Sequence, residues 1–342
     1  MATMDIFADD AFSTISLTTA INQIEYKPQF LRSLGLFTPR PVRTEKVAIE
    51  MRDQTLSLIQ TSPRGAPLEE QTGSKRTVRD FRTVRLAKGD TVMADEIQGI
   101  RAFGTESELQ QVVTEVAERQ MRLIDDIDLT HEHMLLGAVQ GVLTDADGST
   151  LYDWFDEFGV SQAAEIDFDL DNASPASGAV RKKCNQVIRQ MQVAAAGAWV
   201  PGRTSVLALC GDAFWDDLTA HSEVRETYLN TMQAADLREI NQPYESFRYG
   251  GITWVNYRGT DDGSTIAIGT DKAKFVPVGA RNAFEVAYAP MESFEYVNTP
   301  GRDFYSMIIP DRDRNMSVRI EAYSYPLPIC TRPAMLQRAK RT

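Results

Sequence analysis

Few residues in this chain have the types and spacing that chemistry at a protein site requires. His131-Glu-His133 is the one close pair of histidines. On a helix, residues two apart point about 200° away from each other, so both imidazoles cannot face one metal ion. The HExxH pattern, with its histidines four apart, is absent. We therefore expect a solvated or interface pair of histidines and no metal site.

The candidates for a nucleophile are equally weak. His221 is the only other histidine, and no Gly-x-Ser-x-Gly elbow or glycine-rich phosphate loop occurs. The three cysteines, Cys184, Cys210 and Cys330, lie far apart, and Cys210 ends an apolar run typical of a buried, reduced thiol. We predict no catalytic residue, no metal ligand and no cofactor.

An acidic group, Asp153, Asp156 and Glu157, follows the strongest helical segment and is interleaved with aromatic residues. Between Thr105 and Asp171 the acidic residues outnumber the basic ones by about 15. Acidic neighbours alone are weak evidence for a glycosidase, which needs two carboxyl groups at a defined separation. A solvated or contact face is the better interpretation.

Composition narrows the class of protein further. The chain has 342 residues, a net charge of −12 and 43% hydrophobic residues. The length predicts more than one folded unit. The negative net charge argues against nucleic-acid binding over the whole surface. The sequence shows neither a signal-peptide pattern nor an apolar stretch of about 20 residues for a membrane span.

Two segments of the sequence are expected to form structures whose apolar residues a single chain would bury poorly. Residues 1–46 form an irregular arm of scattered apolar residues and prolines. Val47 to Leu86 predicts a β-hairpin whose second strand runs from Val78 to Leu86. Basic residues recur every third position there and decorate both faces, as on a ribbon standing away from any core: Arg76, Arg79, Arg82 and Arg85. Because an isolated ribbon is marginally stable, a neighbouring subunit would support it.

The remaining elements predict an α+β fold. Apolar periodicity predicts a helix of about 30 residues from Thr105 to Leu136, begun by a Thr105/Glu108 capping box. A mixed second unit follows, with helices near 180–191 and 212–230, a strand at 205–210 and a hairpin turning at Gly250-Gly251. In the tail, a strand begins at Val318, and Pro326 and Pro328 are expected to break it.

This order of parts resembles the tailed-phage capsid fold named after phage Hong Kong 97. Three motifs are similar to those of the phage lambda type of major capsid protein, the capsid E family. They are Leu151-Tyr-Asp-Trp-Phe-Asp-Glu-Phe-Gly-Val, Phe247-Arg-Tyr-Gly-Gly-Ile and Tyr323-Ser-Tyr-Pro-Leu-Pro-Ile-Cys-Thr-Arg-Pro.

The resemblance implies a major head protein that assembles into hexamers and pentamers of an icosahedral shell around a double-stranded DNA genome. It implies a division into an N-terminal arm (1–46), an extension loop and its base (47–103), a peripheral domain with a spine helix (104–171), an axial domain (172–300) and a C-terminal strand completing the peripheral domain (301–342). Implied partners are like subunits, a portal protein, a scaffold and a decoration protein, with assembly in the host cytoplasm and a place in the virion.

The basic ribbon is expected to lie over the acidic spine region of a neighbour, where charges set register more than affinity. The contact residues we expect are Glu69, Glu70, Lys75, Arg76, Arg79, Arg82, Arg85, Asp153, Asp156 and Glu157. A Lys–Asn isopeptide crosslink is known in one variant of the fold. Lys75 and Asn315 match no such motif, so we expect none.

Two alternatives remain open at this point. The first is a related shell of a gene-transfer or encapsulin-like particle, which would differ in its cargo. The second is a soluble α+β enzyme that uses Asp153, Asp156 and Glu157, which would be a discrete small particle.

Overall fold

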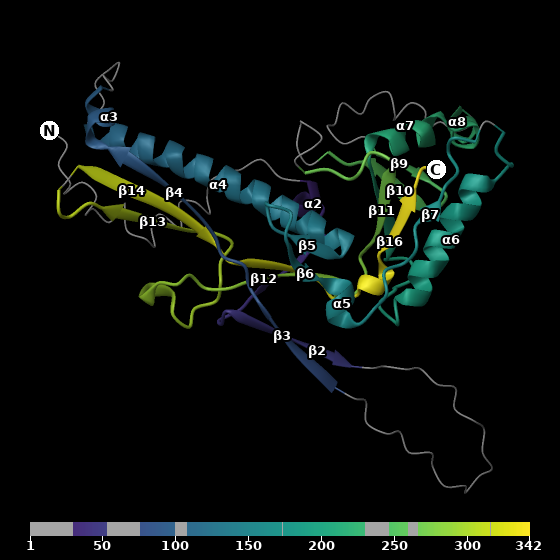
Figure 1. Cartoon of the computed structure of the whole chain (residues 1–342), viewed down its shortest axis with the longest axis horizontal. Helices are drawn as coiled ribbons and strands as arrows, with labels where there is room; N and C mark the ends of the chain where they lie inside the picture. Colours follow the sequence, from purple (N-terminus) through teal and green to yellow (C-terminus); the bar gives the residue numbers. More distant parts are fainter. Residues whose placement is uncertain are drawn as a thin grey trace, which may run out of the picture.

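The computed structural model describes residues 30–52, 76–99, 108–172, 174–229, 246–258, 266–314 and 316–342. In this part of the chain, helices and sheets mix without a regular βαβ alternation, as an α+β fold requires. Two lobes flank a shared core, and a two-stranded ribbon projects away from both (Figure 1).

The elongated lobe is organised by the spine helix α4 (Glu108–Gln140), which at 33 residues spans about 50 Å. Thr105 of the expected capping box lies outside the described residues. The helix runs four residues past the expected end at Leu136, because buried Ala138 and Val139 continue its apolar stripe. It stops at Gly141, whose φ of +87° favours glycine and where a Cβ would collide with the Phe155 ring.

A three-stranded antiparallel sheet lies along α4 and presents one face to it. Its order is β13 (Tyr305–Pro310), β14 (Ser317–Ser324), β4 (Leu86–Met93), and α3 (Ala94–Gly99) follows β4. Val92, Ile320 and Ala322 pack under the helix with Ile124 and Ile127. The alternate residues of each strand point to the opposite face. Met291 and Tyr296 cover that face at Tyr305, whereas its other end, at Met93 and Ile309, is exposed.

The ribbon consists of β2 (Lys46–Arg52) and β3 (Arg76–Arg82), paired antiparallel with Val47 opposite Phe81. The expected single strand from Val78 to Leu86 is wrong. The chain leaves the ribbon after Arg82, where the Thr83 and Val84 amides donate to Glu45 and Pro326 carbonyls, and β4 then joins the spine sheet.

A second small sheet lies near the middle of the molecule, in the order β1 (Thr38–Pro41), β12 (Phe284–Tyr288), β15 (Pro326–Cys330). The strand predicted from Val318 ends at Ser324, before Pro326, as expected, but Pro326 and Pro328 then lie within a new strand, β15. The strand is at the edge of its sheet, where a residue without an N–H is tolerated.

The other lobe is built on a mixed six-stranded sheet (Figure 1). Its spatial order is β7 (Ile166–Asp167), β16 (Gln337–Lys340), β11 (Lys272–Val278), β8 (Ser205–Cys210), β10 (Ile252–Asn256), β9 (Ser246–Tyr249). The hairpin β9–β10 turns at Gly250-Gly251 as predicted.

Helices cover one face of this sheet. They are α6 (Ala179–Ala194), α7 (Asp212–Ala220) and α8 (Ser222–Leu229). The single helix expected over 212–230 is divided at His221, which has an extended backbone. The aromatic centre of the lobe places Trp254, Phe214, Phe168 and Phe275 within ring contact, with centroids 5.5–6.1 Å apart.

The tail, residues 301–342, was expected to complete the peripheral domain, and its strands join three different sheets. It contributes β13 and β14 to the spine sheet, β15 to the central sheet and β16 to the six-stranded sheet. Residues 104–171, expected as the peripheral domain, are divided between the two lobes, because β7 pairs with β16 in the six-stranded sheet. β16 and β7 lie in the six-stranded sheet because the apolar side chains of Ala339 and Ile166 belong to the core beneath α6.

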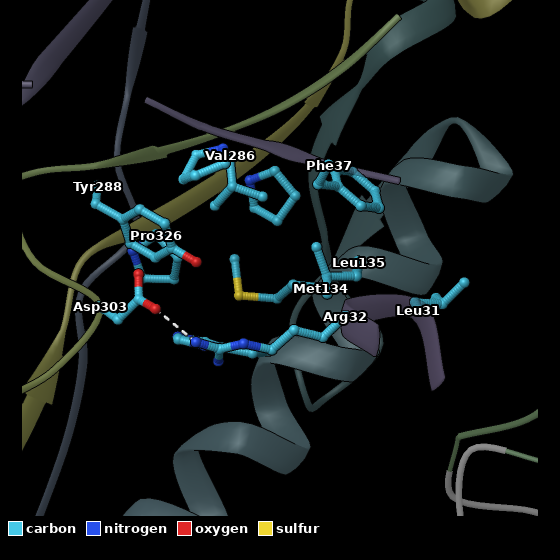
Figure 2. Close-up of a pocket in the computed structure, with 12 residues that line it drawn as sticks. Leu31, Arg32, Phe37, Met134, Leu135, Val286, Tyr288, Asp303 and Pro326 are labelled. Atoms are coloured by element: carbon cyan, nitrogen blue, oxygen red, sulfur yellow. Dashed lines mark hydrogen bonds and ion pairs between the residues drawn. The ribbon is translucent and has the colours of Figure 1, made fainter. Parts of the chain in front are cut away.

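Short α2 (Phe30–Ser33) lies against α4, and Leu31 is fully buried. Figure 2 shows Arg32 reaching Asp303 beside a cavity of about 180 Å³, whose lining includes Met134, Tyr288 and Pro326.

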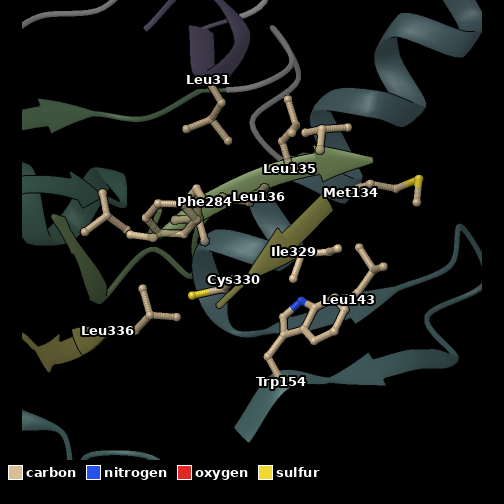
Figure 3. Close-up of a cluster of buried hydrophobic side chains, with 14 of the residues drawn as sticks. Leu31, Met134, Leu135, Leu136, Leu143, Trp154, Phe284, Ile329, Cys330 and Leu336 are labelled. Atoms are coloured by element: carbon tan, nitrogen blue, oxygen red, sulfur yellow. The ribbon is translucent and has the colours of Figure 1, made fainter. Parts of the chain in front are cut away.

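One hydrophobic core joins the two lobes, as Figure 3 shows around Leu136, Phe284 and Ile329. The end of α4 meets the hairpin β5 (Val142–Thr144) and β6 (Thr150–Asp153), then α5 (Trp154–Phe158). The short 3-10 turns η4 (Phe294–Tyr296) and η5 (Pro333–Met335) complete the elements.

Candidate assembly surfaces

The base of the ribbon is fixed to the body of the same chain, so the expectation of a ribbon apart from any core is wrong for this part. Phe81 is buried, with its ring centroid 5.4 Å from that of Trp154 and 5.8 Å from that of Tyr152. The Tyr152 hydroxyl accepts from the Arg82 amide and donates to the Arg82 carbonyl, at 3.0 Å in each case. Farther along β3, Val78 is 61% exposed. The ribbon therefore projects from a rigid footing.

Two of the predicted contact residues pair within this chain. The Arg79 guanidinium lies 3.3 Å from the Glu157 carboxylate and also donates to the Glu157 backbone carbonyl. Both side chains are about 40% exposed, so solvent screens the pair and its net contribution is about 0–1 kcal/mol.

The other two acidic residues of the group have a structural explanation. The Asp153 carboxylate accepts from the Phe155 amide at 2.9 Å and from the Asp156 amide at 3.4 Å, which caps α5. Asp156 is exposed in the first turn of that helix, where its negative charge faces the positive end of the helix dipole. A groove of open surface passes Asp153 and Asp156, but Glu157 does not line it. The three carboxylates therefore do not converge on one substrate position.

The remaining predicted contact residues are scattered. Glu69, Glu70 and Lys75 lie outside the described residues, and only the backbone of Arg76 is described. Arg85 is half-exposed, lies over the Tyr323 ring and pairs with Glu292 at 3.4 Å. Arg82 is exposed on the ribbon.

The part of the outer face of the spine sheet around Met93 and Ile309 is a second exposed surface, whereas Met291 and Tyr296 cover the same face at Tyr305. Met93 and Ile309 are 45% and 43% exposed there, and Arg319 pairs with Glu321 between them at 2.7 Å. Strand periodicity puts Met307 and Tyr323 on the same face. A mixed apolar and charged face of this kind is typical of a protein interface.

The histidines do not form a site. His131 is buried and stacks on Phe304, and its Nε2 is 2.9 Å from the Ser324 hydroxyl. Burial lowers the pKa of His131 to about 3, so the ring is neutral. The expectation of a solvated or interface pair is thus wrong for His131, because Phe304 and Ser324 supply its contacts. His133 points elsewhere, toward Thr144.

No group of three potential metal ligands occurs among the described residues, and no described helix is long and apolar enough to cross a membrane. The three cysteines are buried and free, and burial raises the pKa of Cys184 and Cys330 to about 12. The prediction of a buried, reduced Cys210 is confirmed.

A buried polar cluster on α4 escaped the sequence analysis. Asp128 and Glu132 lie on the apolar side of the spine helix, 3% and 0% exposed, and contact Arg32 and the Leu31 amide. The sequence contained a signal for this cluster, because the two acidic residues are four positions apart and interrupt the apolar stripe of Ile124, Ile127 and Leu135.

Solved structures share the overall fold of this chain. A putative capsid protein of a prophage of E. coli CFT073 matches with a TM-score of 0.56 and 14% identity, covering 96% of this chain and 99% of that one. The capsid of cyanophage P-SCSP1u matches with a TM-score of 0.50 and 11% identity, covering 93% and 90%. The fold is that of phage capsid subunits, the Hong Kong 97-like fold expected from the resemblance.

Sequence comparison places the chain more narrowly. It belongs to the phage major capsid protein E family, whose model matches residues 13–341. It is 26% identical to the major capsid protein of Salmonella phage Felix O1 (isolate Felix O1-VT1) over 95% of both chains. It is 28% identical to the major capsid protein of Pseudomonas phage KPP10 over 67% of this chain and 66% of that one. The family and these relatives are structural capsid proteins, so the enzyme alternative is set aside.

Proposed function

We propose that this chain is the major head protein of a tailed double-stranded DNA bacteriophage and that its copies form hexamers and pentamers of an icosahedral shell. Family membership over residues 13–341 carries the proposal. Two features support it: a ribbon that projects from a fixed base, and a sheet face that is exposed around Met93 and Ile309. Both acquire cover when like subunits meet.

Our proposal includes a specific contact between copies. The ribbon residues Glu69, Glu70, Lys75, Arg76, Arg79, Arg82 and Arg85 would lie against the Asp153, Asp156 and Glu157 region of a neighbour. The pair of Arg79 with Glu157 inside one chain competes with that contact. Apolar burial would supply most of the association, and charges would set register.

Further partners belong to the same proposal. A filled head requires a portal protein, a scaffold and, in many phages, a decoration protein, and the inner surface contacts packaged DNA without base specificity. Assembly would take place in the host bacterial cytoplasm. The alternative cargo shell, of a gene-transfer or encapsulin-like particle, predicts host DNA fragments or protein inside in place of a phage genome.

Negative-stain microscopy of the purified chain tests assembly. We expect closed shells, tubes or capsomers at high protein concentration. A uniform monomer across protein concentration and salt would contradict the proposal.

A matched pair of variants tests the ribbon. Val78→Asp places a charge on the exposed ribbon, and Val193→Asp places the same charge on the 85% exposed Val193 of α6. Neither valine supports the core, so both variants should fold. We expect Val78→Asp to reduce the yield of assembled particles at least about tenfold, because a buried interface charge costs more than 1.4 kcal/mol. Equal assembly by both variants would argue against the ribbon contact.

Sequencing nucleic acid from particles recovered from an infected or induced host separates the cargo alternatives. A single phage genome supports the head-protein proposal, whereas host fragments or an enclosed protein would favour the alternative.

A further inference from the structure

A buried polar junction lies where α2, α4, the end of β10 and the loop before β13 meet. The Glu132 carboxylate accepts from the Leu31 amide at 3.0 Å and from the Tyr257 hydroxyl at 2.9 Å, both on Oε1. One turn earlier on α4, the Asp128 carboxylate accepts from the Arg32 guanidinium at 3.0 Å. Spine helix, α2 and the six-stranded lobe are therefore held at one point.

The charges at this junction do not balance. Among the described residues, Arg32 is the one cation that faces the group, and it meets three carboxylates: Asp128, Glu132 and Asp303 (Figure 2 shows the Arg32–Asp303 pair). Asp125 on the same helix adds a fourth negative charge at longer range. His131 is neutral, and Tyr257 donates a hydrogen bond without adding charge.

Two carboxylate oxygens at the junction lack a donor. Asp128 Oδ2 and Glu132 Oε2 are buried and accept no hydrogen bond from the described part of the chain. A buried, negatively charged oxygen that accepts no hydrogen bond destabilises the fold. Protonation of the carboxyl group removes this cost.

We propose that this junction, with its two donor-less carboxylate oxygens, holds a proton on Asp128, and that loss of the proton as pH rises loosens the attachment of residues 30–33 to the spine helix. The attachment is a property of the single chain and holds whether or not copies assemble. Because Glu132 also holds Tyr257 at the end of β10, loosening reaches the contact between the spine helix and the six-stranded lobe.

Burial supports this assignment, since it raises the pKa of Asp128 to about 7. Arg32 lowers that pKa by less than burial raises it, and Asp125, Asp303 and Glu132 raise it further. Burial raises the pKa of Glu132 as well. A carboxyl group whose pKa is higher in the closed state stabilises that state at low pH, and this stabilisation is lost as pH rises from about 4 to about 7.

Hydrogen-exchange mass spectrometry of the full chain between pH 5 and 8.5 tests the proposal. The measured quantity is the exchange of peptides covering residues 30–37, corrected for the intrinsic pH dependence. We expect their protection to fall by up to about tenfold per pH unit up to pH 7 and then to level off, because opening releases one proton. Sedimentation at each pH confirms that the assembly state is constant.

Asp128→Asn removes the titrating group, and Asp126→Asn is its matched control on the exposed side of the same helix, where Asp126 pairs with Lys88. Asp128→Asn should at least halve the logarithmic slope between pH 5.5 and 7, whereas Asp126→Asn should keep the wild-type slope. The Asp128→Asn melting temperature should exceed that of wild type at pH 8 and match it at pH 5.

The wild-type profile decides the question even if Asp128→Asn fails to fold. Corrected protection of residues 30–37 that is constant from pH 5 to 7, or that rises with pH as a simple Arg32–Asp128 ion pair would require, would overturn the proposal. A profile that also appears unchanged in Asp128→Asn would do the same.

Discussion

The six-stranded sheet and the spine sheet bury their faces in opposite ways. Helices α6 and α7 cover one face of the first, and the shared core beneath Leu207, Leu209 and Val276 covers the other. The spine sheet is covered by α4 on one face, but its other face is covered only in part, by Met291 and Tyr296, and Met93 and Ile309 remain exposed there. The lobe of the six-stranded sheet buries both sheet faces within one chain, whereas the spine sheet leaves apolar surface exposed that another molecule can cover.

The largest effect is expected in the self-sufficient lobe. Trp254→Ala removes a fully buried ring that contacts Phe168, Phe214 and Phe275 and should destabilise the fold by about 3–5 kcal/mol. Thermal unfolding followed by tryptophan fluorescence or calorimetry measures the loss. A loss below about 1 kcal/mol would mean that this lobe also depends on its neighbours.

The footing of the ribbon is the next test. Phe81→Ala empties the space beside Trp154 and Tyr152 and should cost about 3 kcal/mol, toward the lower end of the range because this site lies at the edge of the core. Chemical denaturation measures the loss, and limited proteolysis within the ribbon should accelerate. Unchanged proteolysis would show that Phe81 does not anchor the ribbon.

The Arg79–Glu157 pair should contribute little to folding. Arg79→Ala should change the free energy of unfolding by about 0–1 kcal/mol, and the difference should shrink at 1 M salt because the pair is exposed. The double variant with Glu157→Ala completes a thermodynamic cycle. A coupling above 2 kcal/mol would identify the pair as a structural clamp inside one chain.

The smallest effect on folding is expected on the bare face of the spine sheet. Ile309→Ser should leave the melting temperature of the unassembled chain within about 2 °C, because the side chain is 43% exposed. Particle yield measured by sedimentation should nevertheless decrease. If folding suffers and assembly does not, the contrast between the two sheets fails.

Much of the architecture was predictable from local pattern. The apolar period of α4, the buried run of β8 and the Gly250-Gly251 turn each specify their element through residues close in sequence. The division of the tail among three sheets was not predictable, because β16 pairs with strands more than 60 residues away. Alternation shows that a segment is a strand, but it does not identify the partner strand.

The predicted contact residues show the same limit. The every-third spacing of Arg76, Arg79, Arg82 and Arg85 indicated basic residues on both faces of a ribbon, but not that Arg79 meets Glu157 of its own chain. The Asp128–Glu132 junction was missed because an acid on an apolar stripe is informative only when its cation, here Arg32, is known to lie nearby.

The position of β16 has a consequence for the timing of folding. This strand lies between β7 and β11, and its residues Gln337–Lys340 are synthesised after every other strand of that sheet. A nascent chain emerging from the ribosome therefore has a gap between β7 and β11 until residue 340 is free. The lobe becomes complete only after β16 has been synthesised, which disfavours joining of subunits that still lack this strand.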